Sequence, residues 1–407
     1  MPCNRFITAL LLILIAWPGL SWATNGYFQH GIGVKEQGLG GAAIAYPQSA
    51  LSVATNPAAA ATLGRQFDIG LNWFTPHRSA DNGDGSGYHK SECANFIIPQ
   101  LGYNHPLNTQ LSFAFAAYAN GGMKTDWPYS FFGTTETYSE LEQMVIAPTL
   151  AINLNRKHAL GLSINYIRQT FEARGLQGFA PATPSGTTAY LTDGGEDVST
   201  GWGLRIGYSG QLAPALRIGA FWQPRTKMTA FDDYQELFAE GGELDIPETF
   251  GLGLAVDLSE KLTLATDLVK ICYSDIPALS NFNTVGTDLL GTDNGPGFGW
   301  RDITVAKLGV AYRYSPALTL RIGWNHGENP VRSSQTAMNV LSPATIEDHL
   351  TLGFSWSFSA NSDLSMAYWH GFENEIKGNF VAANGADAAD IKMYQDSISL
   401  AWSWSFD

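Results

Sequence analysis

Serine and histidine side chains could supply the nucleophile and base of a hydrolase, but their spacing in this chain does not favour an enzyme. Such chemistry needs the two groups held together, and many hydrolases place the serine in a Gly-x-Ser-x-Gly turn. The chain lacks this turn, and its histidines are scattered over expected loops, turns and strand ends. They are His30, His77, His89, His105, His158, His326, His349 and His370. A lipid hydrolase stays an alternative, and no catalytic residue is assigned.

Acidic residues suggest a second chemistry, metal binding, which their spacing does not support either. Residues 81–87 (DNGDGSG) have the composition of a calcium loop. Their aspartates do not fall at the alternate positions that calcium ligands occupy in such loops. We therefore expect a flexible surface loop, and we predict no metal and no other cofactor.

Four arginines could bind an anion, because a guanidinium pairs well with a carboxylate. They are Arg205, Arg217, Arg313 and Arg321. Each lies between two large apolar or aromatic residues, as Arg205 does between Leu204 and Ile206. Successive side chains of a strand point to opposite faces. The arginines should therefore lie on the face opposite to the apolar one.

The same alternation recurs along most of the chain and is clearest over residues 398–406 (ISLAWSWSF). A strand of a transmembrane barrel turns its apolar face to lipid and its small or polar face to the lumen. The small-residue face includes Gly203, Gly207, Gly219, Gly251, Gly253, Gly309, Gly323 and Gly353. Two interpretations have equal weight: these glycines leave space in the lumen, or they only relieve crowding in a curved sheet.

Residues 1–23 have the features of a secretory signal peptide. Arg5 precedes an apolar run over residues 6–20, and Ser21-Trp22-Ala23 forms a small-x-small cleavage site. A membrane anchor is the alternative, but the run is short and no second apolar run of about 18 residues follows it. We expect an exported protein.

Composition agrees with an exported barrel. Charged residues make up 15% of the chain, whereas soluble domains average about 25%. The 12 Trp, 16 Tyr and 22 Phe suit the aromatic girdles of a membrane sheet. A net charge of −14 makes a nucleic-acid partner unexpected. The mature chain keeps Cys93 and Cys272, which could form one disulfide or none.

Residues 65–407 are predicted to form an all-β fold, a fourteen-stranded antiparallel transmembrane β-barrel. The strands are expected near 66–75, 95–105, 110–120, 141–154, 159–171, 198–208, 215–228, 248–257, 262–274, 303–314, 318–325, 347–358, 363–370 and 391–406. Short connections alternate with long ones, as periplasmic turns and extracellular loops do in outer-membrane barrels. We expect a multi-pass protein of the bacterial outer membrane, in contact with its lipid, and a monomer.

Residues 24–64 are expected to form a hatch inside this barrel. Fourteen strands enclose a lumen too wide for side chains alone to close. The segment is rich in Gly and Ala and lacks sustained alternation, so it could fold compactly in that lumen. A disordered periplasmic tail is the alternative. A general diffusion porin would have a water-filled lumen without a hatch, and this segment argues against it.

Several motifs resemble those of the FadL/TodX family of outer-membrane channels for long-chain fatty acids and hydrocarbons. The expected hatch contains Gly38-Leu39-Gly40-Gly41-Ala42, followed by Asn56-Pro57-Ala58. The expected barrel contains Gly299-Trp300-Arg301-Asp302 and Leu320-Arg321-Ile322-Gly323-Trp324. The resemblance implies passive uptake of a hydrophobic molecule, which enters a lumen site and leaves sideways into the membrane through a kink in the third strand. It marks Gly38, Gly40, Asn56 and Pro57 as hatch residues.

The lateral exit has candidate residues of its own. Gly121 and Gly122 follow the expected third strand and look similar to the family's kink. Pro99 and Pro148 fall in the two flanking strands, where a proline cannot donate to the ladder. If the substrate is a fatty acid, the four inward arginines are candidates for binding its carboxylate. A neutral hydrocarbon would need none of them.

Overall fold

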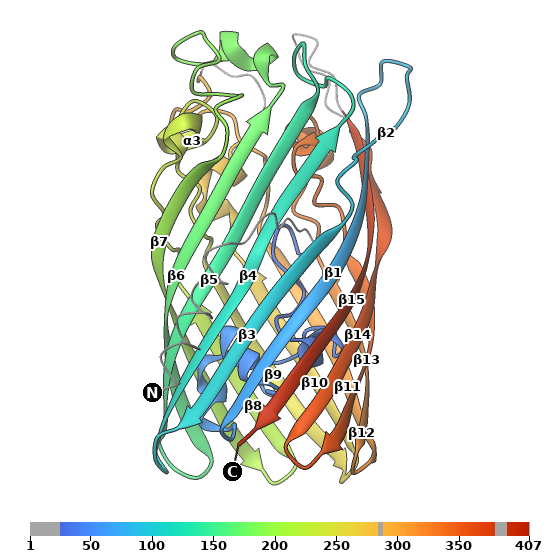
Figure 1. Cartoon of the computed structure of the whole chain (residues 1–407). Helices are drawn as coiled ribbons and strands as arrows, with labels where there is room; N and C mark the ends of the chain where they lie inside the picture. The colour runs from blue at the N-terminus through green and yellow to red at the C-terminus, as the bar shows by residue number, and fades with distance from the viewer. Residues whose placement is uncertain (1–24, 284–287, 379–388, 407) are drawn as a thin grey trace, which may run out of the picture.

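The fold is a closed antiparallel barrel, seen in a computed structural model that describes residues 25–283, 288–378 and 389–406 (Figure 1). Over these residues, fourteen long strands each pair with their neighbours along the chain, and β15 pairs with β1 to close the sheet. The fourteen-strand prediction is confirmed. The predicted signal peptide, residues 1–23, lies outside the described residues.

The barrel strands are β1 (Gln66–Asp81), β3 (Phe96–Pro106), β4 (Leu111–Trp127), β5 (Thr137–Asn153), β6 (His158–Arg174), β7 (Asp197–Ala213), β8 (Leu216–Gln223), β9 (Thr249–Ser259), β10 (Leu262–Ile271), β11 (Ile303–Ser315), β12 (Leu318–Gly327), β13 (Asp348–Ser359), β14 (Ser362–Ile376) and β15 (Asp390–Ser405). The short strand β2 (His89–Lys90) pairs with the end of β1. The third strand of the barrel is therefore β4 in Figure 1.

Short helices occur in the segment before β1 and in the long connections. They are α2 (Val34–Gln37), η1 (Ala50–Ala54), η2 (Pro57–Ala61), η3 (Gln177–Ala182), η4 (Asp232–Tyr234), α3 (Ala239–Gly242), η5 (Tyr273–Asp275), α4 (Pro277–Ser280), η6 (Ser333–Gln335) and η7 (Met338–Val340). In the described part of the chain, no helix has the length and apolar character to cross a membrane.

The outer surface of the barrel carries the apolar series that the alternation predicts. On β1, Ile69, Leu71 and Trp73 are 44–53% exposed, while the residues between them face inward and are buried. Trp202 on β7 and Leu252 on β9 are 68% and 66% exposed. Exposed apolar residues that alternate with buried ones around a closed barrel are typical of a surface that faces lipid.

Most strands extend beyond the predicted ends, on the side of the long connections. The sequence places the end of the third strand at residue 120, but β4 continues to Trp127. Beyond the lipid the outward residues become polar, so the apolar alternation stops although the pairing continues. The strands predicted at 215–228 and 262–274 are instead shorter, and β8 ends at Gln223, just before Pro224. Proline has no N–H to donate to a ladder.

The two cysteines of the described residues are free thiols, and no disulfide joins them. Cys93 and Cys272 are both partly buried and unpaired. They lie in different long connections, one between β1 and β3 and the other after β10.

The alternating connections yield a test of orientation. In a variant lacking both native cysteines, a single cysteine at Asn82 or Thr292 should react on intact cells with a membrane-impermeant thiol reagent, because long connections face outward. A cysteine at Asn108 or Asn155, in the short turns, should react only after the cells are lysed. Labelling of the short turns on intact cells would reverse the orientation.

Candidate functional site in the lumen and the barrel wall

Residues 25–64, here called the N-terminal segment, run inside the barrel (Figure 1, dark blue) and are almost entirely buried. Asn56 caps η2, because its Oδ1 accepts from the Ala58 nitrogen at 3.1 Å. The Asn56 Nδ2 atom donates to the Ile44 carbonyl at 2.8 Å and to the Tyr208 carbonyl of β7 at 2.9 Å. One amide side chain thus orders a turn of the segment and joins it to the wall.

Glycines of the wall lie directly against the backbone of this segment. A Cβ atom on Gly323 would lie 2.1 Å from the Gly40 nitrogen, far closer than atoms pack. A Cβ on Gly207 would lie 2.8 Å from the Cδ of Pro57, and one on Gly353 would lie 3.1 Å from the Gly38 Cα. The space that these glycines leave in the lumen is filled by the N-terminal segment. Crowding within the sheet is not needed to explain them.

Two buried wall carboxylates bind backbone N–H groups of the segment. Asp267 on β10 accepts from the nitrogens of Ala43 and Ile44 at 2.8 and 3.0 Å. Asp68 on β1 accepts from the Ala50 nitrogen at 2.8 Å. Carboxylates that accept backbone N–H groups form strong, charge-assisted hydrogen bonds. The sequence analysis missed both residues, although the alternation alone would have placed them on the inward face.

A cavity of about 80 Å³ lies between the N-terminal segment and the wall, and we call it the lumen cavity. Its lining includes Phe28 and Gln29 of the segment, Asn120 of β4 and Phe221 of β8. The lining also includes two cations, Arg205 of β7 and Lys307 of β11. The cavity is therefore apolar on some sides and positively charged on others, as a site for an amphipathic acid would be.

The hydrogen-bond acceptors of both cations in the lumen cavity are neutral oxygens, and Lys307 also lies opposite Asp267 in the β10–β11 ladder. The Nε and Nη2 atoms of Arg205 donate to the Gln223 Oε1 at 3.1 and 2.8 Å. The Lys307 Nζ donates to the His30 carbonyl at 2.8 Å. The sequence analysis missed Lys307, but this residue lies two positions before the inward Gly309 and so shares its face.

The other three candidate arginines lie away from the lumen cavity. Arg217 forms an ion pair with Asp257 at 2.5 Å, and its guanidinium carbon lies 4.9 Å from the centre of the Tyr46 ring. Arg321 donates to Ser355 at 2.7 Å and to Gln48 at 3.3 Å. Arg313 is exposed and donates to the Glu260 carbonyl. The structure thus separates the four: Arg217 and Arg321 contact the N-terminal segment, and Arg205 alone of the four lines the cavity.

The backbone hydrogen-bond ladder between β3 and β4 is interrupted, at a place that we call the wall gap. In the described chain the β3–β4 ladder runs from Pro106–Ser112 to Gln100–Tyr118 and stops there. Closer to the long connections, residues 96–99 of β3 pair only with β1, and β4 pairs with β5 alone among the strands as far as residue 127. The two edges meet again at the Glu92 nitrogen, which donates to the Asp126 carbonyl at 2.8 Å.

A bulge in β4 faces the wall gap. Ala119 pairs with Met144 and Gly121 with Gln143, so Asn120 is an extra residue, as in a β-bulge. Asn120 also lines the lumen cavity, so the cavity and the wall gap adjoin each other. Gly121 and Gly122 therefore lie within the strand, not after it as the sequence analysis expected.

The N-terminal segment covers the bulge from inside. The Gly122 nitrogen donates to the Tyr27 carbonyl at 3.0 Å, and Phe28 forms a β-bridge with Gly121. A Cβ on Gly121 would lie 2.1 Å from the Tyr27 oxygen, so only glycine fits at this contact.

The two candidate prolines have different positions relative to the wall gap. Pro99 lies at its edge, next to the last paired residue of β3, Gln100. Pro148 pairs normally with Phe115 of β4. It interrupts the ladder on the other side, because the β5–β6 pairs pass from Ile146 directly to Thr149. Pro148 therefore does not weaken the wall at the gap.

A model of the family described as "Outer membrane protein transport protein (OMPP1/FadL/TodX)" matches residues 21–406. The chain belongs to the OMPP1/FadL/TodX family. The resemblance seen in the motifs is thereby confirmed, as are the outer-membrane location and the transport class. The family is described as one of transport proteins, which is consistent with the prediction that the chain is not an enzyme. No curated protein matches the sequence.

Solved structures of FadL/TodX proteins share the fold at low sequence identity. The Pseudomonas putida toluene transporter TodX is 19% identical, with a TM-score of 0.70, covering 93% of this chain and 99% of its own. A Pseudomonas aeruginosa FadL homologue is 14% identical with a TM-score of 0.72, and the coverage is 94% and 100%. The Ralstonia pickettii toluene transporter TbuX is 17% identical with a TM-score of 0.68, and the coverage is 93% and 99%.

One serine–histidine pair occurs in the β1–β3 connection of this FadL/TodX protein. The Ser86 Oγ lies 2.8 Å from the His89 Nε2. The neighbouring carboxylate of Asp84 accepts from Ser86, at 2.5 Å. In a catalytic triad the carboxylate orients the histidine instead. The pair therefore does not have the arrangement of a hydrolase.

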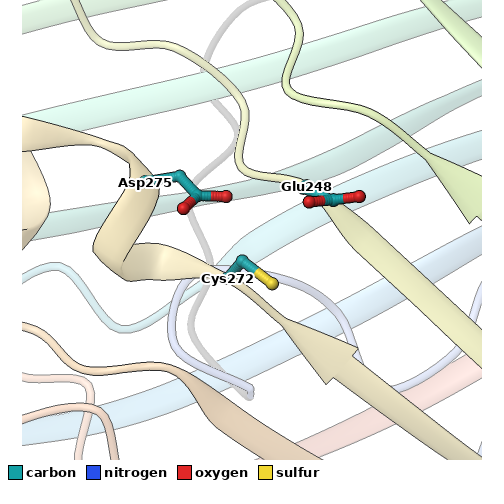
Figure 2. A group of neighbouring side chains, drawn as sticks. All are labelled: Glu248, Cys272 and Asp275. Carbon is teal, nitrogen blue, oxygen red and sulfur yellow. The ribbon is translucent and has the colours of Figure 1, made fainter.

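A small cluster of possible metal ligands lies just before β9 and just after β10. Figure 2 shows Glu248, Cys272 and Asp275, whose ligand atoms all lie within 4.8 Å of one another. Burial, together with the nearby carboxylates, raises the pKa of the Cys272 thiol to about 11. Without a metal the thiol therefore keeps its proton at neutral pH, and a metal would have to displace this proton in order to bind. We assign this cluster no role.

Proposed function

We propose that the protein is a passive channel that takes hydrophobic compounds, long-chain fatty acids or hydrocarbons, into the lumen cavity and releases them through the wall gap into the outer membrane. The observation that carries this proposal is the adjacency of the two features, since Asn120 belongs to both the cavity lining and the bulge at the gap. A hydrophobic molecule that leaves sideways enters lipid and avoids water, so its transfer is downhill. A single chain contains the whole route, so we expect the monomer to be active.

The N-terminal segment acts as the hatch in this proposal. Its backbone lies so close to the wall that little free lumen remains beside it, and its Gly38 and Gly40 allow that approach. Its first turn also covers the bulge, because Tyr27 and Phe28 pair with β4 there. A movement of this turn would connect the cavity to the wall gap.

Relatives with solved structures include two toluene transporters, which support a neutral hydrocarbon as a substrate of this chain. The lumen cavity favours an acid, because Arg205 and Lys307 line it. Their present partners, Gln223 and His30, are uncharged oxygen acceptors. A carboxylate would bind the two cations more strongly than these acceptors do.

Arg205 should contribute to the binding of a fatty acid but not of a hydrocarbon. We expect Arg205→Met to raise the Kd of the purified protein for hexadecanoic acid about tenfold, because a hydrogen bond to a charged group contributes about 1.5–3 kcal/mol. Arg313→Met, which removes an exposed cation far from the cavity, is the control. Equal Kd values for the two variants would remove Arg205 from the binding site.

The uptake experiment separates this function from that of a porin. Cells that express the protein should take up radiolabelled hexadecanoic acid or hexadecane faster than cells that lack it. Proteoliposomes that contain it should not swell in an isotonic sugar solution, because the hatch leaves no aqueous pore. Rapid sugar entry without hydrophobic uptake would establish a general diffusion porin instead.

A further inference from the structure

Arg78 of β1 is a buried cation that has no counter-charge among the described residues. Its side chain is 1% exposed. The Nη1 atom donates to the Cys93 carbonyl at 3.2 Å, while Nε and Nη2 have no hydrogen-bond partner among the described residues. None of the ion pairs in that part of the chain includes Arg78. Burying an unpaired charge costs free energy. A bound anion would therefore stabilise this site.

The guanidinium of Arg78 lies at the upper end of the wall gap. Its carbon is 5.9 Å from the centre of the Phe96 ring, at the start of β3. Cys93, whose carbonyl accepts from Arg78, has its sulfur 3.9 Å from the Asp126 Oδ2 of β4. Asp126 is also where the two edges of the wall meet again. Arg78 thus lies just inside the point where the gap closes.

An apolar cluster begins beside this guanidinium and borders the wall gap from inside. We call it the gap cluster, and it consists of Phe74, Phe96, Ile98, Ala119 and Trp369. Its members come from both edges of the gap, β3 and β4, from β1 next to β3, and from β14, which is two strands beyond β1. A cation at one end of an apolar surface matches a molecule with an anionic head and a long apolar tail.

The height of the site fits the way such a molecule lies in a membrane. On the outside of β1 the exposed apolar series ends at Trp73, and Trp side chains mark the membrane interface. Phe74 follows Trp73 and pairs with Phe96, over which the Arg78 guanidinium lies. A head bound by Arg78 would therefore be near the interface, with its tail at the level of the lipid chains.

We propose that Arg78 is an anion-binding residue of the exit, which holds the carboxylate of a long-chain fatty acid while its tail passes over the gap cluster into the membrane. This inference rests on the proposed lateral exit. It adds a second cation, separate from Arg205 in the lumen cavity, and it makes the exit selective for acids over neutral hydrocarbons. Arg78 acts by binding the substrate directly.

The test compares an acid with a neutral molecule of the same chain length. Arg78→Met keeps the length of the side chain and removes its charge, and Arg78→Lys keeps the charge. In intact cells we expect Arg78→Met to lower the uptake of radiolabelled hexadecanoic acid about tenfold, from the loss of a charge-assisted contact. Hexadecane uptake should stay within about twofold of wild type, and Arg78→Lys should restore much of the acid uptake. Arg313→Met is the control, and immunoblots of outer membranes check the amount of protein.

Each other outcome counts against the inference. Unchanged acid uptake by Arg78→Met, or an equal loss of acid and hexadecane uptake, would make Arg78 a structural residue and leave the proposed function intact. If wild type transports neither probe, the proposed function and this inference fall together. If the variants do not reach the membrane, the wild-type protein is tested instead. It is photo-crosslinked with a hexadecanoic acid that carries a diazirine in its tail. The probe should label peptides that contain Phe74, Phe96 or Trp369, and labelling only elsewhere would overturn the inference.

Discussion

Deletion of residues 24–64 should leave a barrel that inserts into membranes and conducts ions. The N-terminal segment fills the lumen so closely that a Cβ on Gly323 would overlap the Gly40 nitrogen. A fourteen-stranded barrel without this filling is too wide for its own side chains to close. In planar bilayers we expect single-channel currents at least about tenfold above those of the intact protein.

A point variant provides the matched control for this deletion. Gly323→Leu keeps the whole segment but removes the space for its backbone, so it should raise the conductance partway. Gly64→Leu should leave the conductance unchanged, since a Cβ there would meet nothing within 4 Å. Equally low currents from the deleted and intact proteins would show that the segment is not a plug.

Gly121→Leu should abolish the uptake of hydrophobic compounds without unfolding the barrel. The new side chain would occupy the space at the bulge, where its Cβ would lie 2.1 Å from the Tyr27 carbonyl oxygen, and would block the route from the lumen cavity to the wall gap. The lipid-facing apolar series is untouched, so the protein should reach the outer membrane in normal amount. We expect hexadecanoic acid uptake to fall at least about tenfold, to the level of cells without the protein.

The control for this variant is again Gly64→Leu, at a glycine with open space around it. Wild-type uptake by Gly121→Leu would contradict an exit at this bulge. It would favour passage straight through the lumen, past a hatch that moves as a whole.

The number of strands and the faces of each strand could be predicted, because both were read from the two-residue period of side chains along a strand. Outward positions within the membrane face lipid and are apolar, so the pattern of Ile69, Leu71 and Trp73 can be recognised in the sequence alone. The strand ends could not be predicted in this way. Above the lipid, pairing such as that of Lys124 with Glu140 continues without apolar alternation.

The roles of the inward residues could be predicted only in part. The alternation of side chains along a strand tells which face a residue lies on. It does not tell the height of the residue in the barrel or its contact partner. Arg205 and Arg313 therefore looked equivalent, although one lines the cavity and the other is exposed. For the same reason Pro99 and Pro148 could not be told apart, because the side of the strand that lacks a donor depends on the pairing.

The most direct test of the lateral exit is to close the wall gap reversibly. In a variant without the native cysteines, cysteines at Ile98 and Ala119, which share the gap cluster across its two edges, can be joined by a reducible bifunctional thiol reagent. Hexadecanoic acid uptake should be lost when the two edges are joined and should return after reduction, while the single-cysteine variants stay active. Full uptake by the cross-linked protein would contradict the exit through this gap.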